Sequence, residues 1–351
     1  MTTGPVDAGS PPPAAADRAP LSATALRGAL VRPGAIWRDV RVVAQTGSTN
    51  TDLLAAARDG APQGLVLAAE SQTAGRGRMG RRWLSPPRAA LTFSVLLRPG
   101  GVPAGSKGWV PLLAGVAVAS ALRAEAGVDA RLKWPNDVLV DGAKVAGILA
   151  EQAGQAIVAG AGINVSARQD EMPATGATSL AVAGAICTNR QHLLTCVLAE
   201  LERWYLAWLG TAAPQPAAGP EFAGQAAVDA GRAVVDAGRA VVEAGPAVVE
   251  ARRAAVDAEA GSAVVEAGNA ATEAGLARRN AAGTGPDPDA CGLRPAYRRL
   301  SATLGESVRV ELPGGQVLTG IAQDIDESGR LVILAASGLV AVSAGDVVHL
   351  R

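Results

Sequence analysis

The chain has 351 residues, long enough for two or three domains, and its 32 Lys and Arg residues balance its 32 Asp and Glu residues. A formal net charge of zero does not indicate a protein that coats nucleic acid or an anionic membrane. The three cysteines, Cys187, Cys196 and Cys291, are odd in number and lack CxxC spacing, so we expect free or buried thiols in a reducing compartment. With His192 and His349 as the only histidines, a histidine-based zinc site or a Ser-His triad is not expected.

Residues 1–20 are rich in Pro, Ala and Gly. This composition predicts a disordered or loosely attached tail over residues 1–36, with room for a short amphipathic piece near 21–30 but not for a DNA-binding helix-turn-helix. The tail lacks the cationic and apolar regions of a signal peptide. The apolar run at 112–122 is shorter than the roughly 20 residues that span a bilayer. We therefore expect a cytoplasmic protein that binds no membrane.

Residues 37–210 show the pattern of a globular α+β domain. A helix is predicted to open at Thr49, with Asp52 three residues later as in a capping box. Asp141-Gly142 is a strong hairpin signal between two apolar segments. The strands expected here are 40–43, 65–69, 91–97, 132–140, 145–151 and 157–159, and a core-facing helix is expected over 193–208.

A seven-residue unit, Ala-Val-Val followed by Asp or Glu, recurs within residues 211–290, for example at 233–239 and 240–246. A period of seven is typical of coiled coils, but the apolar pair here is two adjacent valines. The glycine in most repeats costs about 1 kcal/mol against alanine in a helix, and Pro246 would break a continuous helix. We therefore predict a disordered low-complexity insertion over 211–290.

Deleting residues 214–288 is accordingly expected to leave both the melting temperature and the activity of the protein nearly unchanged. Loop-closure entropy grows by only about 0.6 kcal/mol per doubling of loop length, so a surface insertion need not destabilise the domain that carries it. Thermal unfolding of the deletion variant beside the full chain measures the effect. A collapse of the melting temperature would show that the repeats pack on the core.

The pattern of a folded domain resumes at residues 291–303, which we assign to the core as a return segment. Residues 304–351 then contain five short apolar segments, separated by turn sequences such as Pro-Gly-Gly at 313–315 and Glu-Ser-Gly at 327–329. Five short strands in under about 50 residues are typical of a small SH3-like β-barrel.

The segment at 71–83, Ser-Gln-Thr-Ala-Gly-Arg-Gly-Arg-Met-Gly-Arg-Arg-Trp, alternates glycines with arginines. Glycine lets the backbone approach a ligand closely, and arginine offers a fixed fork of donors to phosphate or carboxylate. Such stretches also occur as solvated linkers or as RNA-binding tails. Here the segment lies between two predicted strands, which favours a loop that binds a ligand carrying more than one negative charge.

Four segments in this order, together with the small C-terminal domain, resemble the biotin protein ligases. The segments are Thr-Gly-Ser-Thr-Asn at 46–50, the glycine/arginine loop with Gln72, Lys-Trp-Pro-Asn-Asp at 133–137 followed by Lys144, and Gly-Ala-Gly-Ile-Asn at 160–164. The similarity covers residues 37–210 and 291–351, and leaves out the N-terminal tail and the repeats. It indicates the monofunctional class, since no DNA-binding domain is evident.

The resemblance implies an α+β fold: a class II synthetase-like core with a mixed, mainly antiparallel sheet flanked by helices, plus the SH3-like domain. It implies ATP-dependent biotinylation of a carrier-protein lysine, in which biotin and ATP first form biotinyl-5′-AMP and pyrophosphate. The implied partner is the biotin carboxyl carrier domain of acyl-CoA carboxylase, and Mg²⁺ accompanies ATP. A homodimer is compatible with the resemblance, whereas nucleic acid and a resident metal ion are not expected.

By the same resemblance the site residues fall into three overlapping groups. The biotin site is expected to comprise Ser48, Thr49, Asn50, Gln72, Arg76, Gly77, Arg78 and Lys144. The ATP and adenylate site is expected to comprise Gly75, Arg76, Arg78, Arg81, Trp83, Asn136, Gly162 and Asn164. The catalytic residues are expected to be Lys133, Asp137, Arg78 and Lys144.

These residue types suit the chemistry, although several also have a plainer structural role. Two unit charges 4 Å apart repel by about 4 kcal/mol at an effective dielectric constant near 20, and cationic side chains can offset that repulsion. A carboxylate such as Asp137 can accept a proton from the attacking lysine, but an Asn-Asp pair also commonly forms a turn. Thr49 is equally suited to begin a helix, and Trp83 to fill a hydrophobic core.

Three other functions remain in competition at this point. A lipoyl- or octanoyl-transferring ligase would share the architecture but not the glycine/arginine loop as written. A biotin-dependent regulator would keep the residues at 48–50 without needing both Lys133 and Asp137. An RNA-binding protein would use the arginines as a phosphate clamp, against which the zero net charge and few aromatic residues argue.

Overall fold

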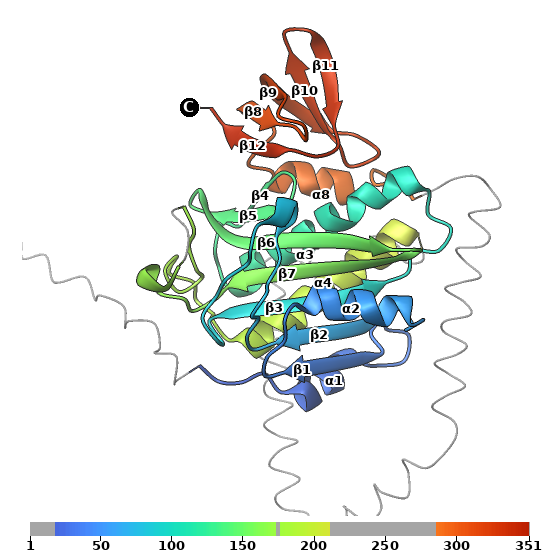
Figure 1. The fold of residues 1–351 in the computed structure, drawn as a ribbon, viewed down its shortest axis with the longest axis vertical. Helices are drawn as coiled ribbons and strands as arrows, with labels where there is room; N and C mark the ends of the chain where they lie inside the picture. The colour runs from blue at the N-terminus through green and yellow to red at the C-terminus, as the bar shows by residue number, and fades with distance from the viewer. Residues whose placement is uncertain (1–17, 173–175, 211–285, 351) are drawn as a thin grey trace, which may run out of the picture.

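The structure is a computed structural model, and it describes residues 18–172, 176–210 and 286–350. Two sheets and the helices around them make up the fold (Figure 1). The helices are α1 (Ala23–Leu30), α2 (Thr49–Arg58), α3 (Trp109–Glu125), α4 (Arg190–Leu209) and α8 (Leu293–Leu300), with 3-10 turns η2 (Arg78–Gly80), η3 (Ala104–Gly108) and η4 (Gln169–Glu171). The strands are β1 (Asp39–Val43), β2 (Leu65–Ala69), β3 (Ala90–Leu97), β4 (Arg131–Lys133), β5 (Asp137–Val140), β6 (Ala143–Ala153), β7 (Ala156–Asn164), β8 (Ser307–Glu311), β9 (Val317–Ile325), β10 (Leu331–Ala335), β11 (Gly338–Val342) and β12 (Asp346–His349).

The larger sheet has seven strands in the order β1-β2-β3-β7-β6-β5-β4. Only β1 and β2 run parallel, because α2 crosses between them, and every other neighbouring pair is antiparallel. The mixed, mainly antiparallel sheet that the resemblance implied is therefore confirmed. Asp141 (φ 51°) and Gly142 (φ 76°) form the two-residue turn that joins β5 to β6, as their sequence predicted.

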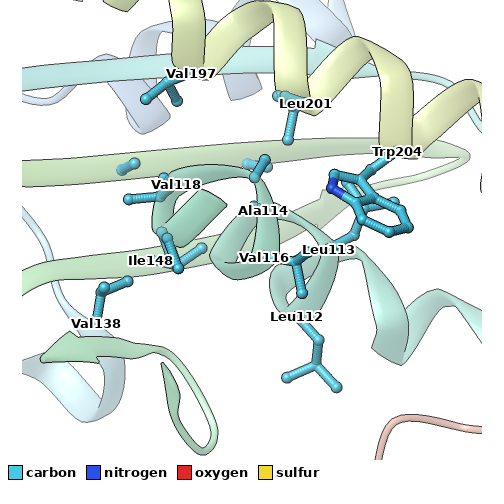
Figure 2. Close-up of a cluster of buried hydrophobic side chains, with 14 of the residues drawn as sticks. Leu112, Leu113, Ala114, Val116, Val118, Val138, Ile148, Val197, Leu201 and Trp204 are labelled. Carbon is cyan, nitrogen blue, oxygen red and sulfur yellow. The ribbon is translucent and has the colours of Figure 1, made fainter. Parts of the chain in front are cut away.

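Helix α3 lies between the sheet and α4, and its burial on nearly all sides explains its apolar sequence. Figure 2 shows its side chains packed against Val138 and Ile148 of the sheet and against Val197, Leu201 and Trp204 of α4. Each fully buried Leu or Val contributes about 1.5–3 kcal/mol relative to exposure. By length and composition alone the stretch Ala104–Glu125 could cross a membrane, but it is largely buried within the protein. Helix α2 covers the opposite face through a smaller cluster with Leu53 and Leu54.

The N-terminal prediction of a loosely attached tail is wrong for residues 18–36. Helix α1 begins after Ser22, whose side chain accepts a hydrogen bond from the Ala25 amide, and it buries Leu26 and Leu30. The short amphipathic piece expected near 21–30 is this helix, and it is packed on the core rather than loosely attached. Residues 1–17 lie outside the described residues, as do residues 211–285 of the predicted insertion.

The C-terminal sheet has five antiparallel strands in the order β11-β10-β9-β8-β12, and β11 and β12 are its edges. The five predicted strands are confirmed, whereas closure into a barrel stays a prediction. Two core tryptophans fix this sheet to the larger domain: Trp109 Nε1 donates to the Glu327 carbonyl (2.9 Å) and Trp134 Nε1 to the Gly329 carbonyl (3.3 Å). Helix α8 packs between α3 and β9.

Candidate active site

A cavity of about 320 Å³ gathers most of the residues that the sequence indicated. It is bounded by β6 and β7, by the start of α2 and by the loop between β2 and β3. Five cationic side chains and one carboxylate line it, although the charges of the whole chain balance. The expected site residues that line this cavity are Ser48, Thr49, Asn50, Gln72, Arg76, Gly77, Arg78, Arg81, Trp83, Asn136, Asp137, Lys144, Gly162 and Asn164.

One wall of the cavity is the first turn of α2. Ser48 is the N-cap residue, and Thr49 is the first helical residue rather than the cap that the sequence predicted. The Gln72 side-chain oxygen takes the capping role, since it accepts hydrogen bonds from the Thr49 amide (2.8 Å) and hydroxyl (3.1 Å). Asp52 instead pairs with the Thr46 hydroxyl. A loop residue from another segment therefore fixes this polar wall.

Asn50 is held by two residues that the sequence analysis missed. Ser94 Oγ lies 2.6 Å from Asn50 Oδ1 and 2.7 Å from Thr49 Oγ1, and the Asn50 amide donates to Glu151 Oε2 (3.0 Å) and to the Leu149 carbonyl (3.1 Å). Ser94 is fully buried and interrupts the apolar run of β3, which was the available signal. With its hydrogen bonds made within the protein, the Asn50 side chain is pre-organised before any ligand arrives.

The glycine/arginine loop folds back on itself as a short ladder. The Trp83 amide donates to the Gly75 carbonyl (2.9 Å), and the Gly77 amide donates to the Arg81 carbonyl (2.7 Å). A Cβ at Gly75 would lie 2.4 Å from the Trp83 carbonyl oxygen, so only glycine fits there. Gly75 is buried and does not line the cavity, so its contact with the adenylate stays a prediction.

Trp83 packs its indole ring against the backbone of β7. A Cβ at Gly162 would lie 2.3 Å from the ring, and one at Gly147 of the adjacent β6 would lie 3.5 Å from it. The half-buried ring also lines the cavity. The two glycines thus make a flat floor, and Trp83 both packs on that floor and presents an aromatic surface to a ligand.

The Lys-Trp-Pro-Asn-Asp segment forms a tight turn between β4 and β5, so the single strand expected over 132–140 is wrong. The buried Trp134 ring and the Asn136 amide, which donates to the Ile148 carbonyl (2.9 Å), anchor this turn. Asn136 Oδ1 accepts a hydrogen bond from the Arg78 guanidinium (3.3 Å). Two motifs 58 residues apart therefore meet at one edge of the cavity.

Asp137 and Lys144 form an ion pair in the cavity, with Oδ1 and Nζ 2.5 Å apart. They lie on the adjacent strands β5 and β6, where Asp137 is opposite Gly147 and Lys144 is opposite Leu139. Burial lowers the pKa of the nearby Arg78 guanidinium, an effect that the charge of Asp346 opposes. Arg78 is therefore a partly desolvated cation, which gains more from an anionic ligand than an exposed cation would.

Two other loop arginines, Arg76 and Arg81, are paired with carboxylates outside the cavity. Arg76 forms an ion pair with Glu151 (3.0 Å), and Arg81 forms one with Asp346 at the start of β12. The second pair connects the loop directly to the C-terminal sheet. No local sequence signal could reveal it, because 265 residues separate the two partners.

Of the four expected catalytic residues, Lys133 is the one that does not line the cavity. It lies opposite Asp137 where β4 pairs with β5, and its catalytic role stays a prediction. Its charge acts on His349 of the C-terminal sheet, whose pKa is lowered first by burial and then by Lys133. The cavity nevertheless brings Arg76, Arg78 and Arg81 together with Lys144 and Asn164.

Comparison with known proteins gives two family matches and several similar chains. Residues 42–167 match the biotin/lipoate A/B protein ligase family, and residues 303–350 match the biotin protein ligase C-terminal domain. The biotin–[acetyl-CoA-carboxylase] ligase of Mycobacterium tuberculosis is 38% identical over 338 residues, which cover 95% of this chain and 97% of that relative. The bifunctional ligase/repressor BirA of Escherichia coli is 40% identical over 140 residues, covering 38% of this chain and 43% of that protein.

Solved structures agree with the fold. A biotin protein ligase from Aquifex aeolicus in complex with biotin and ATP aligns with a TM-score of 0.56 and 22% identity, covering 90% of this chain and all of that chain (100%). The structural alignment spans 90% of the chain, and the M. tuberculosis relative is 38% identical over 95% of it. The chain therefore belongs to the biotin protein ligase family.

Proposed function

We propose that the protein attaches biotin to a lysine of a carrier protein through biotinyl-5′-AMP, at the expense of ATP. The observation that carries this proposal is the concentration of five cations around one carboxylate in a single cavity. The similarity to the M. tuberculosis biotin–[acetyl-CoA-carboxylase] ligase supports the biotin carboxyl carrier domain of acyl-CoA carboxylase as the acceptor. A cavity of this size is within the range that holds cofactor-sized ligands.

In the first step the biotin carboxylate attacks the α-phosphate of ATP, and pyrophosphate leaves. Both reactants are anions, so the barrier contains their mutual repulsion. Arg78 and Lys144 lie on the cavity and lower that repulsion where the new P–O bond forms. Arg76 joins them when it exchanges its ion pair with Glu151 for the ligand phosphate.

The polar wall at the start of α2 is proposed to hold the biotin ring system. Ser48, Thr49 and Asn50 are each under a tenth exposed, so their groups meet the ligand in a desolvated setting. The ureido ring of biotin offers both donors and acceptors, which hydroxyl and amide groups of fixed orientation can match. On the other side of the cavity, Asn136, Asn164 and the Trp83 ring are proposed to face the adenylate.

Mg²⁺ is proposed to enter with ATP. Magnesium is usually held by one or two protein carboxylates together with substrate phosphates, and the residues lining the cavity offer Asp137. A single protein carboxylate is sufficient, because phosphate oxygens and water supply most of the ligands of Mg²⁺. When bound, the ion would neutralise phosphate charge beside Arg78 and Lys144.

In the second step the acceptor lysine attacks the biotinyl carbonyl, AMP leaves and a proton is lost from the amine. A lysine amine has a reference pKa near 10.4, so about one molecule in a thousand is neutral at physiological pH. Asp137 is placed in the cavity to align this amine and to accept its proton. Lys144, its partner in the ion pair, is proposed to stabilise the departing phosphate.

Asp137→Asn is expected to slow transfer of biotin to the carrier by about 100-fold, and formation of biotinyl-AMP by less than about 10-fold. The amide keeps the shape of the side chain but cannot take up the proton. Single-turnover measurements of adenylate formation and of transfer from preformed adenylate separate the two steps. Asp141→Asn is the matched control, because Asp141 lies in the β5–β6 turn and asparagine tolerates its left-handed backbone. Equal losses in both steps would remove the assigned role of Asp137.

Biotin-dependent exchange of labelled pyrophosphate into ATP tests the proposed function as a whole. We expect exchange with biotin and none with lipoate or octanoate. Exchange driven by lipoate would favour the lipoyl-ligase alternative. No exchange with biotin, lipoate or octanoate would indicate a protein that binds its ligand without forming an adenylate.

The domain division is also proposed from the sequence: a core of residues 37–210 with a return segment at 291–303, an insertion at 211–290 and a C-terminal domain at 304–351. The helix α1 extends the core to residues before 37. A cytoplasmic location, a homodimer and the absence of nucleic-acid binding stay predictions.

A further inference from the structure

A second group of chemically reactive side chains lies where the end of α3 meets the beginning of α4. It consists of Glu125, His192 and Cys196, and none of the three lines the proposed active site. Glu125 is the last residue of α3, while His192 and Cys196 lie one turn apart on α4. Residues four apart on a helix project from the same face, so both α4 side chains are directed toward α3.

The three side chains are already close enough to coordinate one metal ion. His192 Nε2 lies 2.7 Å from Glu125 Oε2 and 3.7 Å from Cys196 Sγ, and all three ligand atoms lie within 4.8 Å of one another. A tetrahedral zinc ion with bonds of about 2.0 Å to nitrogen and 2.3 Å to sulfur places these two atoms about 3.5 Å apart. The observed separation of His192 and Cys196 therefore needs almost no change.

We propose that Glu125, His192 and Cys196 bind a zinc ion that joins α3 to α4. Imidazole nitrogen, thiolate sulfur and carboxylate oxygen are the donors that zinc takes in proteins, whereas magnesium and calcium prefer oxygen alone. Binding requires the Glu125–His192 contact to widen from a hydrogen bond to about 3.4 Å, a shift of under about 1 Å for a half-buried and an exposed side chain.

Cys187 is also half-buried, but its Sγ is not among the three clustered ligand atoms. The fourth position of a tetrahedral site is therefore left to water or to a movement of Cys187 toward the ion.

The plainer alternative is an ion pair between Glu125 and His192 that merely connects the helices. It predicts a small contribution to stability and no specific response to zinc. A zinc site predicts the reverse, because an ion that binds only the folded chain stabilises it in proportion to the logarithm of its concentration. The two readings therefore differ in a measurement that does not involve ligase activity.

The test uses the full chain, purified without a histidine tag and treated with a chelator before zinc is added back. We expect one zinc per chain by elemental analysis, and a rise in melting temperature of about 5 °C or more at a free zinc concentration of about 100 times the dissociation constant. Cobalt(II) should give a thiolate-to-metal charge-transfer absorption. Cys196→Ser and His192→Ala are expected to weaken zinc affinity at least about 100-fold and to abolish the thermal shift.

The chain offers matched controls, because its remaining histidine and its third cysteine lie elsewhere. Cys291→Ser and His349→Ala should retain the stoichiometric zinc, the thermal shift and the cobalt absorption. Cys187→Ser should weaken binding less than Cys196→Ser does. Zinc binding that survives Cys196→Ser and His192→Ala, or a wild-type chain that takes up no zinc, would overturn the proposal.

Discussion

Lys144→Ala is expected to lower the rate of biotin-dependent pyrophosphate exchange by about 100- to 1000-fold. The Lys144 ammonium is a cation of the cavity and lies 2.5 Å from the Asp137 carboxylate. Its removal takes away positive charge and also leaves Asp137 uncompensated beside two anionic substrates. One such repulsion is worth about 4 kcal/mol at 4 Å and an effective dielectric constant near 20, enough to account for a loss of this size.

The exchange should be measured at saturating biotin and ATP, so that the loss reports on the chemical step rather than on binding. Lys107→Ala is the matched control, because Lys107 lies in η3 and does not line the cavity. It is expected to exchange label at the wild-type rate. A Lys144→Ala variant within about threefold of wild type would show that the cavity does not hold the reacting groups.

Glu70→Ala is expected to destabilise the fold by about 3–5 kcal/mol, because it leaves a buried guanidinium without its partner. Glu70 and Arg190 form an ion pair of 2.7 Å, and their side chains are only 8% and 6% exposed. Glu70 also accepts a hydrogen bond from the Leu21 amide (2.6 Å), so the same change weakens the attachment of the segment before α1. The melting temperature should fall on the order of 10 °C.

Glu200→Ala provides the comparison for this loss of stability. Glu200 pairs with Arg203 at the same distance of 2.7 Å, but both side chains are more than a quarter exposed. Solvent-exposed pairs of this kind contribute about 0–1 kcal/mol. Differential scanning calorimetry of the two variants should give a large fall for Glu70→Ala and almost none for Glu200→Ala. Similarly small falls in melting temperature for both variants would mean that the buried Glu70–Arg190 pair stabilises the fold no more than the exposed Glu200–Arg203 pair does.

The sequence predicted the residues of the cavity better than it predicted how they are held there. The glycine/arginine loop and the residues at 48–50 could be selected because their chemistry is concentrated in short segments. Ser94, Glu151 and Asp346 could not, because each acts through a contact with a distant segment. Such contacts depend on strand order and register, which local patterns do not encode.

The clearest error has a physical cause. Residues 18–36 were assigned to the tail on composition, yet the few apolar side chains of α1 are buried beside β1 and α4. Tertiary packing, and not residue type, decided the outcome there. Lys133 was selected by its motif; it lies opposite Asp137 and does not line the cavity, and its role in catalysis stays a prediction.

We propose that biotin and ATP react in the cavity lined by the five cationic side chains. The biotinyl group then passes from this cavity to a carrier lysine. Intact-mass spectrometry of a biotin carboxyl carrier domain, incubated with the protein, biotin and Mg-ATP, tests this most directly. We expect the carrier to gain the mass of one biotinyl group, and to gain none when ATP is omitted or when its acceptor lysine is replaced. A carrier of unchanged mass after incubation with the active, folded protein would contradict the assignment.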